Sequence, residues 1–141
     1  MNNPISLSAS KDRLAAALEI LFASADAFVP FDPARRYNPK EREPYDALTD
    51  RYRRAFESSL KFFRTLERFR EAAPSESFRD LLQRMEKYSV ITGTPLWIGL
   101  RDTRNRIAHE YLPEELAKIY ADIVGPAATE LRYVLGQCSA L

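Results

Sequence analysis

The sequence predicts an all-α fold, an antiparallel bundle of four or five helices, and two observations support this. Apolar residues recur three and four positions apart along several long stretches, which is the period of one helix face. Clusters of Pro, Gly, Ser and Asn separate these stretches, and no stretch alternates apolar and polar residues as a strand does. Helices joined in this way pack beside their chain neighbours, which gives an antiparallel bundle.

The first predicted helix runs from about Ala9 to Val29. Ser8 or Ser10 is expected to cap it, because a serine hydroxyl accepts a hydrogen bond from an N–H group of the first turn. Pro30 marks its end, since proline cannot continue the hydrogen-bonded ladder. The residues from Phe31 to Glu43 contain two further prolines and a basic pair, and we expect them to form a loop.

A long second helix is expected to begin at Pro44, because the first turn of a helix leaves N–H groups free and proline has none. Its apolar face follows spacings of three and four over about seven turns. The residues of this face are Leu48, Tyr52, Ala55, Ser59, Phe62, Leu66, Phe69 and Ala73. The opposite side carries charges of both signs and is expected to face solvent.

A third, shorter helix is expected from a serine cap at Ser75 or Ser77 to about Val90. Ser77 followed by Asp80 resembles a capping box with a shorter acid. The stretch Ile91–Gly93 should close this helix.

The last two predicted helices both begin at a proline. The fourth covers residues 94–111, because threonine followed by proline is a strong start signal and Pro113 disfavours helix just before it. The fifth begins at Pro113, with two acidic residues in its first turn where the backbone dipole favours them. Gly125 and Pro126 should kink or split it before a last stretch through Leu135.

Length, charge and cysteine content limit the classes of function. At 141 residues the chain has the length of one ordinary domain, so residues 1–141 are expected to form one helical domain. Its formal net charge of +1 means that any anion site must be local. The only cysteine, Cys138, excludes a disulfide framework and fits a reducing cytoplasm. Membrane insertion and secretion are not expected, because the chain has neither a long apolar run nor a signal peptide.

The sequence lacks the motifs of several common cofactor-binding and catalytic sites. Four scattered glycines cannot make a phosphate-binding loop or a dinucleotide fingerprint. One histidine and one cysteine cannot make an ordinary zinc site within one chain. A serine triad would have to use that histidine without a nucleophile elbow. We therefore expect neither a metal nor another cofactor.

The fourth predicted helix carries the residues of greatest chemical interest. Helical geometry sorts them into three rows. The rows are Leu96, Leu100, Thr103 and Ile107, then Trp97, Arg101, Arg104, Ala108 and Tyr111, then Asp102, Asn105 and His109. The first row is an ordinary core-facing stripe, and the two others bring their polar residues together at the C-terminal end of the helix.

His109 with arginines nearby is a candidate site for phosphate chemistry. Imidazole titrates near neutral pH, whereas guanidinium stays cationic at every relevant pH. The arginines concerned are Arg101, Arg104 and Arg106. Asn105 and Asp102, one and two turns away, are expected to fix the imidazole tautomer. The alternative is a histidine that only caps the helix or pairs with a carboxylate.

The pattern of Arg104, Asn105, His109 and Tyr111, Arg-x4-His-x-Tyr with Asn after the Arg, resembles the signature of HEPN domains. In detail it is similar to the HepT toxins and to the related substrate-binding partners of minimal nucleotidyltransferases. Residues 52–57, the tryptophan upstream of the motif and the proline-interrupted final helix add to the resemblance.

The resemblance implies a HEPN fold and a metal-independent endoribonuclease, the toxin of a toxin–antitoxin module. Arg104 and His109 from two subunits would line a cleft at a homodimer interface. His109 would transfer protons, Arg104 would stabilise the charge of the scissile phosphate and Asn105 would position groups. Tyr111 would be adenylylated by a cognate nucleotidyltransferase antitoxin, which silences the toxin. Arg106, where the family commonly has an uncharged residue, adds charge that suits RNA or a partner surface.

Two other classes of function stay open at this point. One is a non-catalytic member of the same group, a subunit that presents a nucleotide or substrate to a nucleotidyltransferase through the cleft between Arg104 and Tyr111. The other is a purely structural helical bundle. The three classes differ in whether His109 must transfer a proton, only contributes to binding, or does neither.

Overall fold

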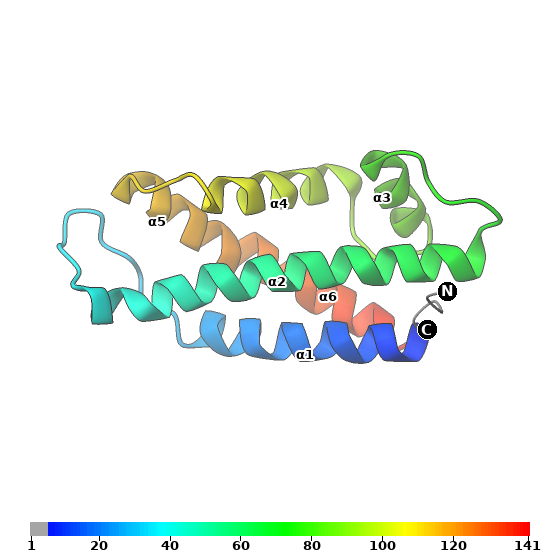
Figure 1. Cartoon of the computed structure of the whole chain (residues 1–141), viewed down its shortest axis with the longest axis horizontal. Coiled ribbons are helices and arrows are strands. Elements are labelled where there is room, and N and C mark those ends of the chain that lie inside the picture. Colours follow the sequence, from blue (N-terminus) through cyan, green and yellow to red (C-terminus); the bar gives the residue numbers. More distant parts are fainter. Residues whose placement is uncertain (1–5) are drawn as a thin grey trace, which may run out of the picture.

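Helices α1 (Leu7–Asp26) and α2 (Pro39–Arg70) form an antiparallel hairpin that extends along the whole molecule (Figure 1). The computed structural model describes residues 6–141, and all regular elements in that range are helical. The short helices α3 (Phe78–Lys87) and α4 (Thr94–Ile107) lie above α2 in this view. Within residues 6–141 the predicted helical bundle is therefore confirmed.

The N-terminus of α1 lies earlier than the sequence predicted. The Ser6 hydroxyl accepts a hydrogen bond from the Ala9 N–H (3.0 Å), so Ser6 is the cap, and Ser10 is a buried residue within the helix. The extra residues at this end bring Leu7 against the hydrophobic core, which favours the longer start. The helix ends at Asp26, short of the expected Val29.

The start of α2 corrects the predicted loop from Phe31 to Glu43. Asn38 and Glu41 form a capping box, in which each side chain accepts a hydrogen bond from the other residue's N–H (2.8 and 3.1 Å). Pro39 therefore occupies the first-turn position that the sequence analysis assigned to Pro44. Pro44 lies inside the helix, where it is exposed.

The predicted apolar face of α2 is correct over most of its length. Every residue expected on it from Leu48 to Leu66 is buried. Phe69, however, is 64% exposed, and Ala73 lies beyond the end of the helix at Arg70. The last turn of α2 extends past the neighbouring helices, so its apolar side chains are not covered.

The second half of the chain follows the expected start signals. Ser77 accepts a hydrogen bond from the Asp80 N–H (3.0 Å) and caps α3, and α4 begins at Thr94 as predicted. The end of α3 falls at Lys87 instead of Val90. Ser89 adopts a positive φ of 61°, which turns the chain out of the helix before that point.

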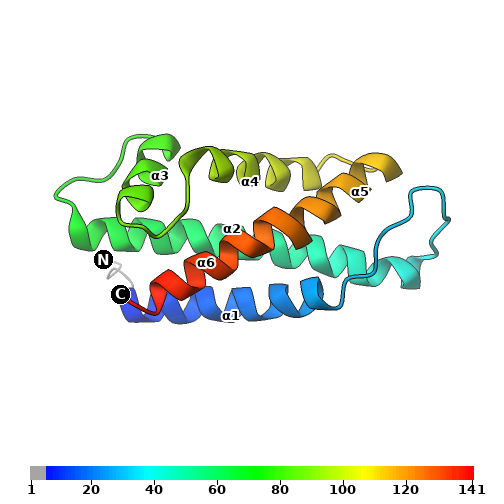
Figure 2. The same cartoon turned by 180° about the vertical axis from the view of Figure 1, so that it is seen from behind.

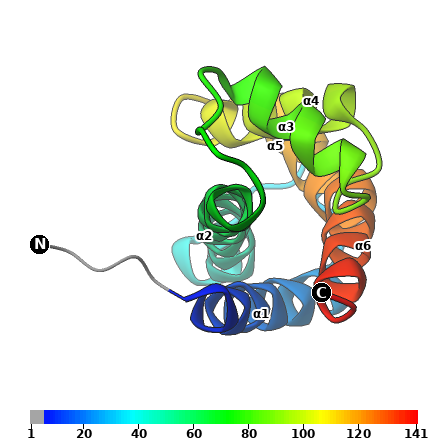
Figure 3. The same ribbon diagram turned by 90° about the vertical axis from the view of Figure 1, so that its right-hand side faces the viewer.

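Helix α5 (Pro113–Asp122), a π-helical turn η1 (Ile123–Ala127) and helix α6 (Ala128–Cys138) form one rod. The rod crosses α2 and α1 obliquely on the side opposite to that seen in Figure 1 (Figure 2). The predicted start at Pro113 and the predicted irregularity at Gly125–Pro126 are both confirmed. Viewed along the bundle, α2 lies between α1 and the layer of α3 and α4, with α6 to one side (Figure 3).

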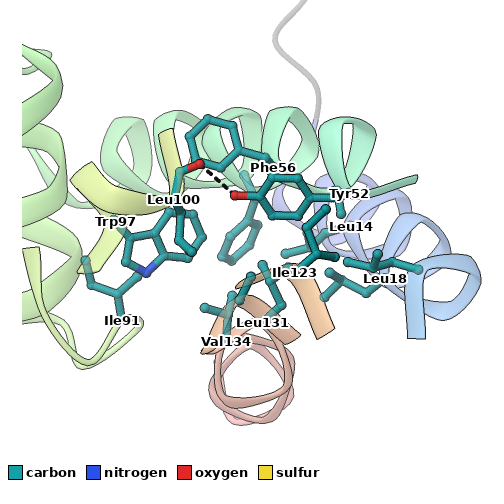
Figure 4. Packing of buried hydrophobic residues seen from close by; sticks show 14 of the residues in the cluster. Leu14, Leu18, Tyr52, Phe56, Ile91, Trp97, Leu100, Ile123, Leu131 and Val134 are labelled. Carbon is teal, nitrogen blue, oxygen red and sulfur yellow. Dashed lines mark hydrogen bonds between the residues drawn. The ribbon is translucent and has the colours of Figure 1, made fainter. Parts of the chain in front are cut away.

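Aromatic side chains from α2 and α4 make up much of the core (Figure 4). Trp97, which the helical rows placed beside Arg101 and Arg104, is fully buried against Phe56 and Phe63. The Tyr52 hydroxyl donates a hydrogen bond to the Leu100 carbonyl oxygen (2.6 Å) and joins the middle of α2 to α4.

Glu130 on α6 is buried and holds α4 from the other side. Its carboxyl oxygens accept hydrogen bonds from the Trp97 indole N–H (2.8 Å), the Thr92 N–H (3.0 Å) and the Thr92 hydroxyl (2.6 Å). Since buried polar groups need partners, these bonds fix the beginning of α4 relative to α6. No helix within residues 6–141 combines the length and the apolar character needed to cross a membrane.

Candidate functional site

The candidate site lies where α4 ends and the chain turns back into α5. The last helical residue is Ile107, so the predicted end at Tyr111 is wrong. The N–H groups of His109 and Glu110 both donate to the Arg106 carbonyl oxygen (3.1 and 3.0 Å), which tightens and closes the final turn. Leu112 must be extended because a proline follows it, and the intervening residues are used to reverse the chain.

Arg104 is held in the last turn of α4 by three neighbours. Its guanidinium forms an ion pair and hydrogen bond with Glu57 of α2, and its Nε–H donates to Asn105 Oδ1 (2.9 Å). The same guanidinium lies 5.0 Å from the centre of the Phe56 ring. The side chain keeps 25% of its surface exposed. Arg104 is thus oriented by the protein while a quarter of its side-chain surface remains accessible.

His109 lies beyond the helix end and is exposed to solvent. Its imidazole forms no hydrogen bond or ion pair with any residue from 6 to 141. The expected tautomer-fixing hydrogen bonds are not formed, because Asn105 bonds to Arg104, and the exposed Asp102 forms no hydrogen bond or ion pair with His109. Both ring nitrogens of His109 are therefore accessible to an external partner.

The two other arginines point to different parts of the bundle. Arg101 stacks over Phe78 of α3, with its guanidinium carbon 4.5 Å from the ring centre. Arg106 pairs with Glu115 in the first turn of α5 (2.7 Å), a carboxylate that it shares with Lys118 (3.0 Å). These contacts join α4 to α3 and α5. Of the three arginines named by the sequence analysis, Arg104 is the one held beside the middle of α2.

The turn between α4 and α5 exposes two adjacent large side chains, Tyr111 and Leu112. Tyr111 is 82% exposed and Leu112 is 58% exposed. The phenol of Tyr111 is therefore free of the core. Exposed large apolar side chains next to each other often mark a contact surface.

Glu57 is the residue of this site that the sequence analysis did not single out. It comes 47 positions before Arg104, and the helical periodicity places it on the solvent side of α2.

Burial raises the pKa of the neighbouring Tyr52 far above its ordinary value, and the charge of Arg104 opposes this rise only in part. Tyr52 therefore stays protonated and structural, and Glu57 is the acidic group that faces Arg104.

The arrangement provides one accessible imidazole and one anchored guanidinium at the same end of α4. Within residues 6–141 no three His, Cys, Asp or Glu side chains come together as a metal-ligand set. No protein-family model matches the chain, and no curated protein matches it significantly. The motif around Arg104 and His109, together with the helical bundle that carries it, is thus what a functional assignment rests on.

Proposed function

We propose that this protein is a HEPN-type ribonuclease, the toxin of a cytoplasmic toxin–antitoxin module. The observation that carries the proposal is the position of His109, which is the only histidine in the sequence. It is exposed immediately after the helix that anchors Arg104. A proton-transfer group and a phosphate-binding group are thereby presented from one exposed helix end.

The chemistry expected of such a site is attack of a ribose 2′-hydroxyl on the adjacent phosphate. One imidazole accepts the 2′-hydroxyl proton as the new P–O bond forms, and a second group protonates the departing 5′-oxygen as the old bond breaks. A chain with one histidine supplies one of these groups, so a two-fold homodimer would supply the other through the partner subunit's His109. Arg104 would stabilise the charge on the phosphate oxygens.

The exposed turn after α4 suits both the homodimer and a regulatory partner. Leu112 offers apolar surface beside the motif, and the Tyr111 hydroxyl is open to modification. A cognate nucleotidyltransferase antitoxin would transfer AMP from ATP to the Tyr111 oxygen and release pyrophosphate. The added phosphate would place negative charge beside Arg104 and His109 and repel the RNA backbone.

A second function, a non-catalytic binding subunit for a nucleotidyltransferase, is favoured by one observation. Arg104 is already paired with Glu57, and His109 has no orienting partner among residues 6–141. Catalytic histidines are usually oriented by a neighbouring group, whereas a binding surface does not need this. Under this alternative the helix end would present a nucleotide or substrate to the partner enzyme.

Growth arrest and RNA integrity on induced expression, without any partner protein, separate these functions. Wild type, His109→Ala and Arg104→Ala are compared at matched protein levels, with Lys40→Ala as a control for loss of an exposed cation in the first turn of α2. The ribonuclease predicts arrest and RNA cleavage in wild type and control, and their loss in both site variants. Intact RNA and normal growth in all four strains contradict it and favour the binding subunit or the structural bundle.

Cleavage by the purified protein is then followed in buffer that contains EDTA. The proposed mechanism uses an imidazole and a guanidinium, so wild-type cleavage should persist when divalent cations are chelated. Products should end in a cyclic 2′,3′-phosphate, since the 2′-oxygen is the nucleophile. Loss of all cleavage in EDTA would refute the proposed mechanism.

A further inference from the structure

A groove between α1 and α2 lies beside the candidate site and is lined by four cations. Its volume is about 350 Å³, and it is bordered by Arg13 of α1 and by Lys61, Arg64 and Arg68 of α2. Hydroxyl groups of Ser10 and Ser58 lie on the same walls. We call this hollow the α1–α2 groove.

Three of these cations lack a carboxylate partner in the described part of the chain. Arg13, Lys61 and Arg68 are exposed and form no ion pair among residues 6–141. Arg68 makes only a hydrogen bond to the Thr65 hydroxyl (3.2 Å). Arg64 has a long contact with Glu67 (3.4 Å), which binds Arg84 more closely (2.9 Å).

Cations without a carboxylate partner occur elsewhere in residues 6–141 too, but in this groove three of them line one hollow. Elsewhere on α2, Arg53 and Arg54 share Asp50 at 2.9 Å each, as exposed cations on a helix commonly do. Four like charges held in one hollow with a single carboxylate, that of Glu57, repel each other, and this repulsion is relieved when an anion binds. The charge and the hydrogen-bond donors of the α1–α2 groove therefore suit an anion.

Glu57 connects the groove to the candidate site. Glu57 lines the groove and at the same time pairs with Arg104 of α4. From Glu57 to Arg68 the helix rises about 17 Å, at about 1.5 Å per residue. A second hollow, which shares Glu57 and Lys61 with the groove, continues it towards Arg53 and Arg54. The cations therefore form a track along α2 and not one compact pocket.

We propose that the α1–α2 groove binds successive phosphate groups of a single RNA strand and guides that strand to Arg104. This inference rests on the proposed ribonuclease function and adds the path of its substrate. A track of separated cations matches a polymer with repeated negative charges better than it matches one small anion. The open, exposed groove also leaves the bases free, so binding through it is expected to be independent of sequence.

Salt dependence gives the quantitative test. Four cations that each neutralise one phosphate of a single strand give a slope of about −2.8 in log K against log salt, at about −0.7 per contact. Affinity should then fall about 50-fold between 50 and 200 mM salt. Removing two contacts by Lys61→Ala and Arg68→Ala should reduce the slope to about −1.4 and this loss to about sevenfold.

The experiment measures binding of a fluorescein-labelled, twelve-nucleotide RNA of mixed sequence to the whole protein. All proteins carry His109→Ala, so that cleavage does not disturb the equilibrium. The groove variant adds Lys61→Ala and Arg68→Ala, and a matched control adds Arg36→Ala and Lys40→Ala, which removes the same charge from exposed positions outside the groove. Matching urea midpoints establish that both variants fold equally well.

Weaker binding and a smaller salt slope in the groove variant alone support the proposal. Equal slopes in the groove variant and the control overturn it, because the groove cations then do not contact the RNA. Binding of poly-glutamate of equal charge with the same affinity and slope also overturns it, in favour of an acidic protein partner. The ribonuclease function is judged separately from cleavage by the wild type, so either idea can fail without the other.

Discussion

Glu130→Ala is expected to lower the free energy of unfolding by about 3 kcal/mol. The change leaves the Trp97 indole N–H, which is buried at 0% exposure, without its acceptor. A buried unpaired donor costs about 1–3 kcal/mol. Water partly replaces the two hydrogen bonds from Thr92 because Thr92 is exposed, so their joint loss costs only about 1 kcal/mol. These terms add to about 2–4 kcal/mol, or about 12 °C in Tm.

Urea unfolding followed by tryptophan fluorescence is the appropriate assay, because Trp97 is the only tryptophan and lies at the perturbed position. Glu130→Gln keeps one acceptor oxygen and should lose roughly half as much stability. Glu19→Ala, which removes an exposed acid from α1, should stay within about 0.5 kcal/mol of wild type. A loss below about 1 kcal/mol for Glu130→Ala, with an unchanged urea dependence, would refute the role assigned to these hydrogen bonds.

Three further outcomes follow from individual side chains. Glu57→Gln removes the acid that competes for Arg104, so RNA affinity should rise roughly two- to fivefold, about 0.5–1 kcal/mol, in the same fluorescence binding assay. Burial raises the pKa of Glu67, but hydrogen bonds from Ser75 and Arg84 outweigh this effect and hold the pKa below its ordinary value. Stability should therefore fall as pH drops from the ordinary glutamate pKa through the lower pKa of the folded state. Glu67→Gln should make the urea midpoint less dependent on pH in this acidic range. Burial also raises the pKa of the Cys138 thiol to about 11. Its reaction with Ellman's reagent at pH 8 should therefore be more than about 100-fold slower in the folded protein than in urea, and equal rates would contradict this.

The helix starts were the most predictable part of the fold, because they depend on local hydrogen bonding. Ser77, Thr94 and Pro113 each begin a helix or cap it as expected. The start of α2 was wrong because two prolines compete for the same role, and the choice of Pro39 depends on the Asn38 capping box. The observed helix ends differ from the predicted ones because they depend on turns and on how far the neighbouring helices cover each helix. The spacing of apolar residues describes neither.

The candidate site was only partly predictable for a similar reason. The motif gives the order of Arg104, Asn105 and His109 along the chain, and the structure shows each of them at the end of α4 or just beyond it. The partner of Arg104 depends on how α2 packs against α4, which no spacing in the sequence reports. The same holds for Glu130, whose burial beside Trp97 depends on the oblique crossing of the last rod.

The π-helical turn at Ile123–Ala127 has a consequence for changes in chain length. Its Ala128 N–H reaches the Ile123 carbonyl oxygen, five positions back, so the turn holds one residue more than an α-helix of the same rise. Deletion of Pro126 can return the rod to regular α-helix while both flanking faces keep their orientation, because every remaining residue of the turn carries the N–H that an α-helix uses. A single deletion within α6 upstream of Glu130 would instead rotate that side chain by about 100°, away from Trp97. The irregular turn is therefore a place in the last rod where the gene can lose one codon, that of Pro126, and keep the fold.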